Sequence, residues 1–254
     1  MKTYVEIFGQ EFGFCRSAKA NYSDKFNRMV KLACMFEQLS DKLDGMISRG
    51  GFVTENARLA LALKMMMNTG IRIGNEGSAE GYMTKPHPYS KEKPKFVQTY
   101  GLTTITRQHV QVKGRKVAFF FLGKKHVDNT FEVTGDLAKQ LRAYLKVYQG
   151  DTLFDITAYQ LTKFIKRYVG RSFTPKDFRT LRANMCAYEM MEEILDRENP
   201  TTKKEYNAEV KEIAEYVAEN LNNTASVCKT SYIDSYLWDE FAEARPIIRN
   251  YGTR

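Results

Sequence analysis

Residues 109–133 read HVQVKGRKVAFFFLGKKHVDNTFEV, and this stretch decides the fold class. It holds three short segments with the alternation or composition of β-strands, at 109–112, 116–122 and 127–133. Turn-forming residues separate them, first Lys113-Gly114 and then Gly123-Lys124-Lys125-His126. The pattern therefore predicts a small antiparallel three-stranded meander whose second turn carries lysines.

Apolar residues at helical spacing surround the meander on both sides. Before it, the spacing predicts one helix over 24–48 and a second over 54–67, with Thr54 as its cap. After it, the spacing predicts helices at 135–148, 157–169, 176–197, 201–222 and 231–244. The segment 78–98 holds three prolines and several lysines, which predicts a long exposed loop. The expected fold class is α+β: a mostly helical chain with one small antiparallel three-stranded meander.

The composition is that of a basic globular protein. Of 254 residues, 39 are Lys or Arg and 30 are Asp or Glu, which gives a formal net charge of +9. A hydrophobic fraction of 43% and an aromatic fraction of 13% exclude a disordered chain. No run approaches the roughly 18 apolar residues that a transmembrane helix needs. Because positive charge favours polyanions, nucleic acids are the first candidate partners.

The chain shows neither an export signal nor a cysteine pattern for metal binding. Its opening, MKTYVEIFGQEFGFCRS, carries Glu6 and Glu11 and has no apolar signal core. The four cysteines are scattered and lack the Cys-x-x-Cys spacing that zinc sites use. We therefore expect a cytoplasmic protein in a reducing compartment, with no bound metal and no attachment to a membrane.

Two candidate functional residues lie near or within the predicted meander. Arg72 lies between isoleucines and glycines in TGIRIGNE, residues 69–76, and an apolar setting calls for an anionic partner. That partner is either a bound anion or an acid of the chain such as Glu76. Lys124 at the hairpin tip is either a mobile cation for a phosphate or leaving group, or a solvated turn lysine.

Two more candidate stretches follow the meander. Lys176 and Arg179 share one face of the first turns of a helix that begins at Pro175. Backbone amides at that end also favour anions, so the pair is either a phosphate site or a solvated basic face. Tyr232 lies in LNNTASVCKTSYI, residues 221–233, a polar turn that leads into a helix. In a chain with 15 tyrosines, this position alone does not distinguish it.

In chain order, these stretches resemble the type IB DNA topoisomerases, in the compact form typical of poxviruses and bacteria. The resemblance rests on five strings in the right order: TGIRIGNE, YGLTTITRQHV, FFFLGKKH, KDFRT and LNNTASVCKTSYI. Each string is weak alone, whereas the ordered set is specific. It runs from about Asn21 to about Trp238.

The resemblance implies an enzyme that relaxes supercoiled duplex DNA. Tyr232 would attack a phosphodiester, leaving a 3′-phosphotyrosyl bond and a free 5′-hydroxyl. Arg72 and Arg179 would hold the non-bridging oxygens of the scissile phosphate, because guanidinium groups match the charge gathered in the transition state.

The other three site residues that the resemblance implies act on protons and on the phosphate. Lys124 would be the general acid that protonates the departing 5′-oxygen, and Lys176 would assist it. Asn223 stands where some family members have histidine, so it would donate a hydrogen bond to the phosphate but could not shuttle protons.

The resemblance also sets expectations for cofactors and partners. A phosphodiester is exchanged for a phosphodiester, so no ATP is expected. The implied site residues include no metal-ligand cluster, so no metal is expected either, with divalent cations at most stimulating the reaction. Double-stranded DNA is the expected partner of a monomer. The protein would act in the cytoplasm, on the bacterial nucleoid or, for a virus or phage, on DNA in the host cell.

Three features depart from the family pattern. Only residues 1–20 precede the first helix, too few for the usual N-terminal β-rich domain, so we expect residues 21–254 to form the catalytic domain. A separate partner chain would then be one way to supply the DNA clamp. The segment 78–98 lengthens the region after Arg72, either as an extra DNA contact or as a solvated loop. Lys125 adds a charge next to Lys124.

Two other interpretations remain to be weighed. Tyrosine recombinases share the fold and the nucleophile, but their second-arginine box is His-x-x-Arg, where this chain has Lys176-x-x-Arg179. The chain's three histidines, His87, His109 and His126, all precede that box. A non-cutting DNA-binding relative would be expected to have lost the tyrosine or an arginine, and all of these are present.

Overall fold

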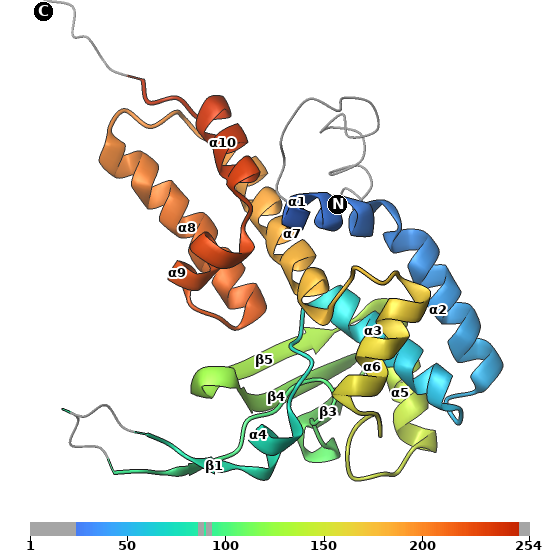
Figure 1. Cartoon of the computed structure of the whole chain (residues 1–254). Coiled ribbons are helices and arrows are strands. Elements are labelled where there is room, and N and C mark those ends of the chain that lie inside the picture. The colour runs from blue at the N-terminus through green and yellow to red at the C-terminus, as the bar shows by residue number, and fades with distance from the viewer. Residues whose placement is uncertain (1–23, 86–88, 90–92, 249–254) are drawn as a thin grey trace, which may run out of the picture. The chain divides into compact units, whose positions relative to one another are not determined.

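The structure is a computed structural model, and it describes residues 24–85, 89 and 93–248. The chain forms two compact units. In the described part, 24–36 and 176–248 make up one, which we call the C-terminal unit, and 37–175 make up the other, which we call the meander unit. Figure 1 shows that helices dominate and that a small three-stranded sheet and a two-stranded ribbon accompany them, so the predicted α+β class is confirmed.

The meander unit combines helices with two small antiparallel sheets. Its helices are α2 (Phe36–Gly50), α3 (Glu55–Thr69), α4 (Glu76–Glu80), α5 (Gly135–Val147) and α6 (Ala158–Tyr168). The main sheet has the order β3-β4-β5, formed by Val110–Lys113, Lys116–Gly123 and Val127–Val133. A separate ribbon pairs β1 (Tyr82–Met83) with β2 (Phe96–Val97).

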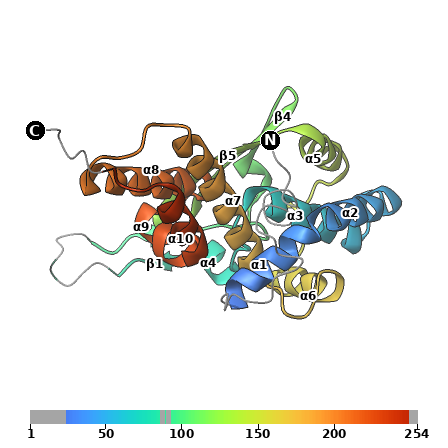
Figure 2. The same cartoon turned by 90° about the horizontal axis from the view of Figure 1, so that it is seen from above.

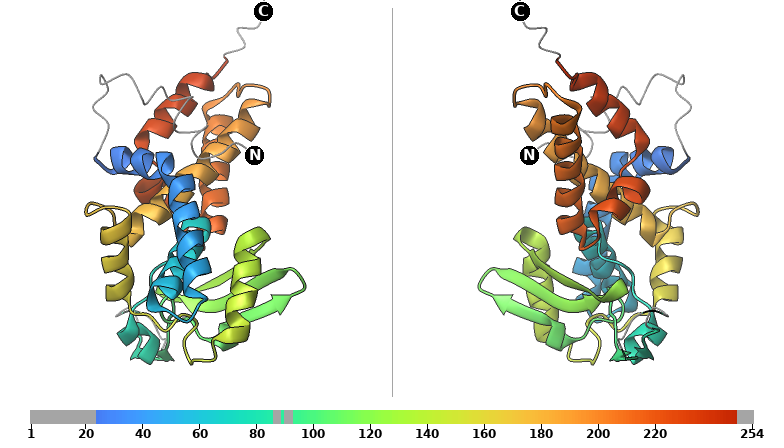
Figure 3. Two further views of the ribbon diagram at one scale, coloured as in Figure 1. Left: turned by 90° about the vertical axis from the view of Figure 1, so that its right-hand side faces the viewer. Right: turned by 90° about the vertical axis from the view of Figure 1, so that its left-hand side faces the viewer.

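Alternation along β4 explains how the main sheet is buried on one face. Val117, Phe119 and Phe121 are buried, whereas Phe120 is 40% exposed. The ring of Phe119 stacks at 5.0 Å on that of Phe131, its partner in β5. Helix α5 packs against β4 and lies along the sheet in Figure 3. The central strand is therefore held by apolar contacts from the sheet and from α5.

Helix α3 is the buried helix of the meander unit. Thr54 caps its start, since its hydroxyl accepts a hydrogen bond from the amide of Ala57, and Gly70 ends it with φ of 63°. Ten of its residues are buried, the run Met65–Met67 among them, so these flexible methionine side chains fill the core. This helix ends at Thr69, three residues before Arg72, and so fixes the point at which the chain that carries Arg72 leaves the core.

The C-terminal unit is entirely helical in its described part. It contains α1 (Asp24–Cys34), α7 (Pro175–Leu195), α8 (Lys203–Leu221), the short α9 (Ala225–Val227), a π-helix over Cys228–Tyr232 and α10 (Ser235–Ala244). Its core joins apolar residues of α7, α8 and α10, which lie close together in Figure 2. Buried Arg245 follows α10, and its guanidinium binds both carboxylate oxygens of Glu209, at 3.1 and 2.8 Å.

Several element predictions are confirmed and three are wrong. The three strands lie within a residue of their predicted limits, and Pro175 is the first residue of α7. The helix expected over 24–48 is two helices that meet at Met35. The segment 78–98 is not simply a loop, because α4 extends into it and its ends pair as the β1–β2 ribbon. Tyr232 ends a π-helix, and the following helix begins only at Ser235.

Residues 1–23 lie outside the described part, so the expectations for 1–20 stay predictions. Within the described ranges, no helix combines the length and apolar character that crossing a membrane would require. The same ranges hold no cluster of three or more His, Cys, Asp or Glu side chains placed to bind a metal ion.

Candidate active site

Arg179 and Tyr232 meet in the C-terminal unit. Arg179 lies in the first turns of α7 and is 4% exposed, and its guanidinium carbon lies 5.3 Å from the centre of the Tyr232 ring. This is a cation–π contact, which places positive charge against the face of a half-buried phenol. The two residues are 53 positions apart in sequence (232 − 179), so the fold brings the predicted arginine and tyrosine together.

Arg179 also fixes the end of α8 that leads to Asn223. Its Nη2 atom donates a hydrogen bond of 2.5 Å to the carbonyl of Leu221, the last residue of that helix. Asn222 then turns the chain with φ of 47°, a left-handed conformation that asparagine tolerates. The amide nitrogen of Asn223 donates at 2.9 Å to the carbonyl of Ala218. Asn223 is thus held by a helix cap to which Arg179 is bonded.

The side chain of Asn223 is poised to bind an acceptor. Its side-chain nitrogen, Nδ2, is buried and has no hydrogen-bond partner in the described part of the chain. A buried donor left without a partner costs about 1–3 kcal/mol, so such groups normally point to a ligand, a water or an ion. A neutral amide donates without exchanging protons, which fits contact with a phosphate oxygen.

Tyr232 is the last residue of a widened helical turn. The amide of Ile233 donates at 3.0 Å to the carbonyl of Cys228, five residues earlier, which is the hydrogen bond that defines a π-helix. Cys228 and Ile233 are 0% and 3% exposed, so both ends of the turn are anchored in the core. The aromatic ring between these anchors remains half-buried and available at the surface of the unit.

Two side chains that the sequence reasoning missed hold the backbone of this turn. Asn184, fully buried in α7, donates from Nδ2 to the carbonyl of Tyr232 at 3.0 Å and accepts at Oδ1 from the amide of Asp234 at 2.8 Å. Lys25 of α1 donates from Nζ to the carbonyls of Ser231 and Tyr232, at 3.1 and 3.2 Å. Together they hold the turn that carries Tyr232, one from α7 and the other from α1.

Positive charge gathers around the same turn. Burial lowers the pKa of Lys25, the carboxylate of Asp234 opposes this effect, and the charge of Lys176 adds to it. Lys176 itself is exposed in the first turn of α7. The adjacent acid, Asp177, accepts a hydrogen bond of 3.2 Å from Nε of Arg28. Lys25 and Arg179 therefore place cationic side chains directly on Tyr232 or its carbonyl, Lys229 lies within the same turn, and Lys176 lies close enough to Lys25 to lower its pKa.

Arg72 lies in the meander unit, in a loop built on a contact between two glycines. Gly74 has φ of 100°, and a Cβ on Gly101 would lie 2.5 Å from the Cα of Gly74, so only glycine fits there. The amide of Leu102 donates at 2.8 Å to the carbonyl of Arg72, and the amide of Thr103 donates at 2.8 Å to that of Ile73. The backbone of Arg72 is therefore tied to the segment 101–103.

The strand that leads to Lys124 is bonded to the same segment. Lys124 begins the turn between β4 and β5, and the amide of Tyr100 donates at 2.8 Å to the carbonyl of Leu122, near the end of β4. Residues 100–103 thus bond to the chain beside Arg72 at one end and beside Lys124 at the other. The stretch YGLTT that the sequence comparison singled out is the link between these two predicted site residues.

The structure therefore distributes the six predicted residues over both units. Lys176, Arg179, Asn223 and Tyr232 belong to the C-terminal unit, and Arg72 and Lys124 belong to the meander unit. Buried Asn184 could have drawn attention as a polar residue in an otherwise apolar stretch of helix, ANMCA, residues 183–187. Lys25 carried no comparable signal, because a lysine at a helix start is ordinarily solvated.

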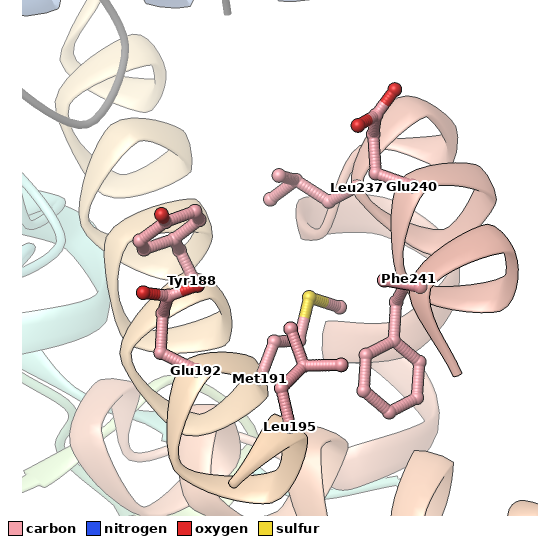
Figure 4. A pocket seen from close by; sticks show the side chains of 8 residues that line it. Tyr188, Met191, Glu192, Leu195, Leu237, Glu240 and Phe241 are labelled. Atoms are coloured by element: carbon pink, nitrogen blue, oxygen red, sulfur yellow. The ribbon is translucent and has the colours of Figure 1, made fainter. Parts of the chain in front are cut away.

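A pocket between α7 and α10 is lined by other residues. Figure 4 shows Tyr188, Met191, Glu192, Leu195, Leu237, Glu240 and Phe241 around it, mostly apolar side chains with two carboxylates. None of the six predicted residues lines this pocket. This pocket and the four predicted site residues of the C-terminal unit therefore lie at different places.

The chemistry of these residue types is that of phosphoryl transfer. Guanidinium groups bind phosphate oxygens bidentately, a neutral amide adds one hydrogen bond, and a phenol supplies an oxygen nucleophile. A lysine on a turn can deliver a proton to a leaving group.

Comparison with known proteins identifies the family. The family model "Eukaryotic DNA topoisomerase I, catalytic core" matches residues 16–235, well over half of the chain. The DNA topoisomerase 1B of Acanthamoeba polyphaga mimivirus is 23% identical over 199 residues, which are 73% of this chain and 55% of that protein. The chain thus spans about half the length of the curated relative it matches. The ordered motifs, the α+β fold and the family match agree, and the chain belongs to the DNA topoisomerase I catalytic-core family, of type IB.

Proposed function

We propose that this protein relaxes supercoiled duplex DNA by cutting and resealing one strand. The hydroxyl oxygen of Tyr232 attacks the scissile phosphorus, forms a 3′-phosphotyrosyl bond and breaks the bond from phosphorus to the 5′-oxygen. The electron pair left on that oxygen takes a proton from Lys124, and the tyrosine's own proton passes to solvent. The 5′-hydroxyl end then swivels and attacks the phosphotyrosine to restore the strand.

The observation that carries this proposal is the contact between Arg179 and Tyr232. A fixed guanidinium against the phenol stabilises negative charge that develops on the attacking oxygen and on the phosphate next to it. The buried amide nitrogen of Asn223 supplies a donor without a partner in the described residues, as an oxyanion ligand requires. Arg72 is the second guanidinium ligand, and Lys176 assists proton delivery by Lys124.

The proposed reaction conserves bond energy. One phosphodiester is replaced by another and then regenerated, so no ATP is consumed. The cationic side chains named above do the work that a metal ion does in other phosphoryl-transfer enzymes, so we propose that the reaction proceeds without a metal. Duplex DNA is the proposed substrate and the net charge of +9 favours its binding. We propose that the protein acts as a monomer.

The test is relaxation of supercoiled plasmid in EDTA without ATP. Wild type should relax the plasmid, and Tyr232→Phe, which lacks the attacking oxygen, should not. Tyr206→Phe is the matched control, because this partly buried tyrosine of α8 packs on Phe241 against the core of the same unit and is not one of the predicted site residues. Relaxation by Tyr232→Phe at the wild-type rate would refute the assignment of the nucleophile.

A strand-transfer activity of the tyrosine-recombinase kind is the alternative to be excluded. It shares the nucleophile, so Tyr232→Phe alone does not separate the two. Incubating the protein with a second, labelled duplex whose 5′ ends are phosphorylated does, because a topoisomerase complex is then resealed by its own 5′-hydroxyl, whereas a recombinase cuts both duplexes and joins one to the other.

A further inference from the structure

The turn that carries Lys124 has an unfavourable backbone and depends on its neighbours. Lys125 and His126 have φ of 64° and 58°, a left-handed conformation that costs roughly 1–2 kcal/mol for each residue other than glycine. Two such residues in succession do not hold their shape unaided. The direction in which Lys124 points is therefore set by contacts made to this turn.

One set of contacts comes from the sheet itself. Asn129 of β5 donates from Nδ2 at 2.8 Å to the carbonyl of Val127. The same Nδ2 atom approaches Gly123 so closely that a Cβ on Gly123 would lie only 2.1 Å from it. These contacts fix the two strand ends. They do not reach the residues with positive φ, which lie beyond the ends of the strands.

The contact to the turn itself comes from the β1–β2 ribbon. The hydroxyl of Tyr82 and Nε2 of His126 share a hydrogen bond of 3.1 Å. Their rings are stacked, with centres 6.1 Å apart and planes inclined by 25°. Tyr82 and His126 are 44 residues apart in sequence, and both belong to the meander unit. An aromatic stack and a hydrogen bond thus join the ribbon to one of the two strained residues.

The ribbon is anchored firmly enough to act as a support. Its two strands pair Tyr82 with Val97 and Met83 with Phe96. The Phe96 ring covers Gly81, where a Cβ would lie 2.1 Å from it. At the base, the amide of Thr99 donates at 2.9 Å to the carbonyl of Ser78. Tyr82 is therefore held on a paired strand and not on a free loop.

We propose that Tyr82 and His126 are positioning residues that hold Lys124 in place for proton transfer to the 5′-oxygen. This inference rests on the proposed function, in which Lys124 is the general acid. Neither side chain touches the reacting atoms: Tyr82 holds His126, and His126 holds the turn. We call the Tyr82–His126 contact the brace. When it is lost, Lys124 is no longer held in one position, so the bond to the 5′-oxygen breaks more slowly, while the position of Tyr232 does not change.

The test separates proton delivery from every other step by changing the leaving group. Single-turnover cleavage is measured on a duplex cut at the site mapped with wild type, first with the natural phosphodiester and then with sulfur in place of the bridging 5′-oxygen. A thiol has a pKa of about 8.5, so the sulfur departs as a thiolate and needs no proton. A defect in proton delivery therefore disappears on the sulfur substrate, whereas a defect in binding or nucleophilic attack remains.

Three variants and one control probe the brace. Tyr82→Phe removes the hydrogen bond and keeps the stack, and Tyr82→Ala removes both. His126→Asn removes the ring but retains a residue that tolerates positive φ. Tyr159→Phe, an exposed tyrosine of α6, is the control.

We expect Tyr82→Ala and His126→Asn to cleave the natural substrate roughly 5- to 10-fold more slowly, the rate equivalent of one or two weak contacts. Tyr82→Phe should show a smaller loss, and all three should match wild type on the sulfur substrate. Unchanged cleavage of the natural substrate, or equal slowing on both substrates, overturns the inference.

Lys124→Ala distinguishes failure of this inference from failure of the proposed function. If sulfur rescues Lys124→Ala but not Tyr82→Ala, the general acid stands and the brace does not exist. If sulfur fails to rescue Lys124→Ala, Lys124 is not the acid, and this inference falls together with the role of Lys124 in the proposed function. Thermal unfolding of each variant shows whether the meander unit remains folded.

Discussion

Replacing Asn184 by alanine is the sharpest test of how the Tyr232 turn is held. The side chain is fully buried and makes three hydrogen bonds, to the carbonyls of Thr180 and Tyr232 and from the amide of Asp234. Alanine fits the helix well, so α7 itself should persist. The loss falls on the segment that carries the nucleophile.

The magnitude follows from the groups left behind. The amide of Asp234 loses its acceptor in a buried site, which costs about 1–3 kcal/mol, and the carbonyl of Tyr232 loses one donor, worth about 1 kcal/mol. The carbonyl retains its bond from Lys25 at 3.2 Å, so the turn loosens without detaching. If about half of this sum is expressed as misplacement of the tyrosine, cleavage slows by roughly 5- to 30-fold, since 1.4 kcal/mol is tenfold.

The assay is single-turnover formation of the covalent protein–DNA complex, with thermal unfolding measured in parallel. Asn220→Ala is the matched control, because Asn220 makes the same kind of bond to the carbonyl four residues earlier, at 3.0 Å, but lies in α8. We expect Asn184→Ala to lose cleavage and Asn220→Ala to keep it. Wild-type cleavage by Asn184→Ala would refute the argument that this side chain places the nucleophile.

Four further outcomes are expected. Asn223→Ala should slow cleavage roughly 100-fold, as loss of one oxyanion donor does elsewhere, with little change in DNA affinity. Arg245→Ala should destabilise the protein by about 3–5 kcal/mol in urea unfolding, because it leaves the carboxylate of Glu209 without its buried partner and removes the donors to two part-buried carbonyls. Alkylation at pH 8 followed by mass spectrometry should modify exposed Cys34 but not Cys186, whose pKa burial raises to about 12. Because burial lowers the pKa of Lys25, the folded state binds fewer protons than the unfolded state between that pKa and 10.5, so the stability of wild type relative to Lys25→Met should rise with pH in this window.

The sequence predicted what depends on local pattern. Strand limits at 109–133 and the cap at Thr54 follow from alternation and from the side chain next to the helix, and both are confirmed. The six site residues followed from family motifs, and the structure brings Arg179 and Tyr232 into contact. How residues 100–103 link the chain beside Arg72 to the chain beside Lys124 depends on hydrogen bonds between segments distant in sequence, which periodicity does not reveal.

What the sequence did not predict depends on distant partners. The π-helix that ends at Tyr232 is held by Asn184, 48 residues earlier than Tyr232, and by Lys25, 207 residues earlier. The ribbon in 78–98 has only two paired residues on each strand, too short for alternation to register, and its prolines favoured a loop. The break between α1 and α2 at Met35 could not be predicted, because no glycine or proline lies next to it.

The anchoring of the Tyr232 turn has a mechanical consequence. In the covalent intermediate that we propose, one DNA end is bonded to this tyrosine while the other rotates, so any drag on the rotating duplex pulls on the phenol oxygen. The pull passes from the ring into a backbone whose carbonyl is gripped from two helices and whose flanking residues, Cys228 and Ile233, are embedded in the core. Torque is then spread through α1 and α7, and the phosphotyrosine stays aligned for resealing while the DNA turns.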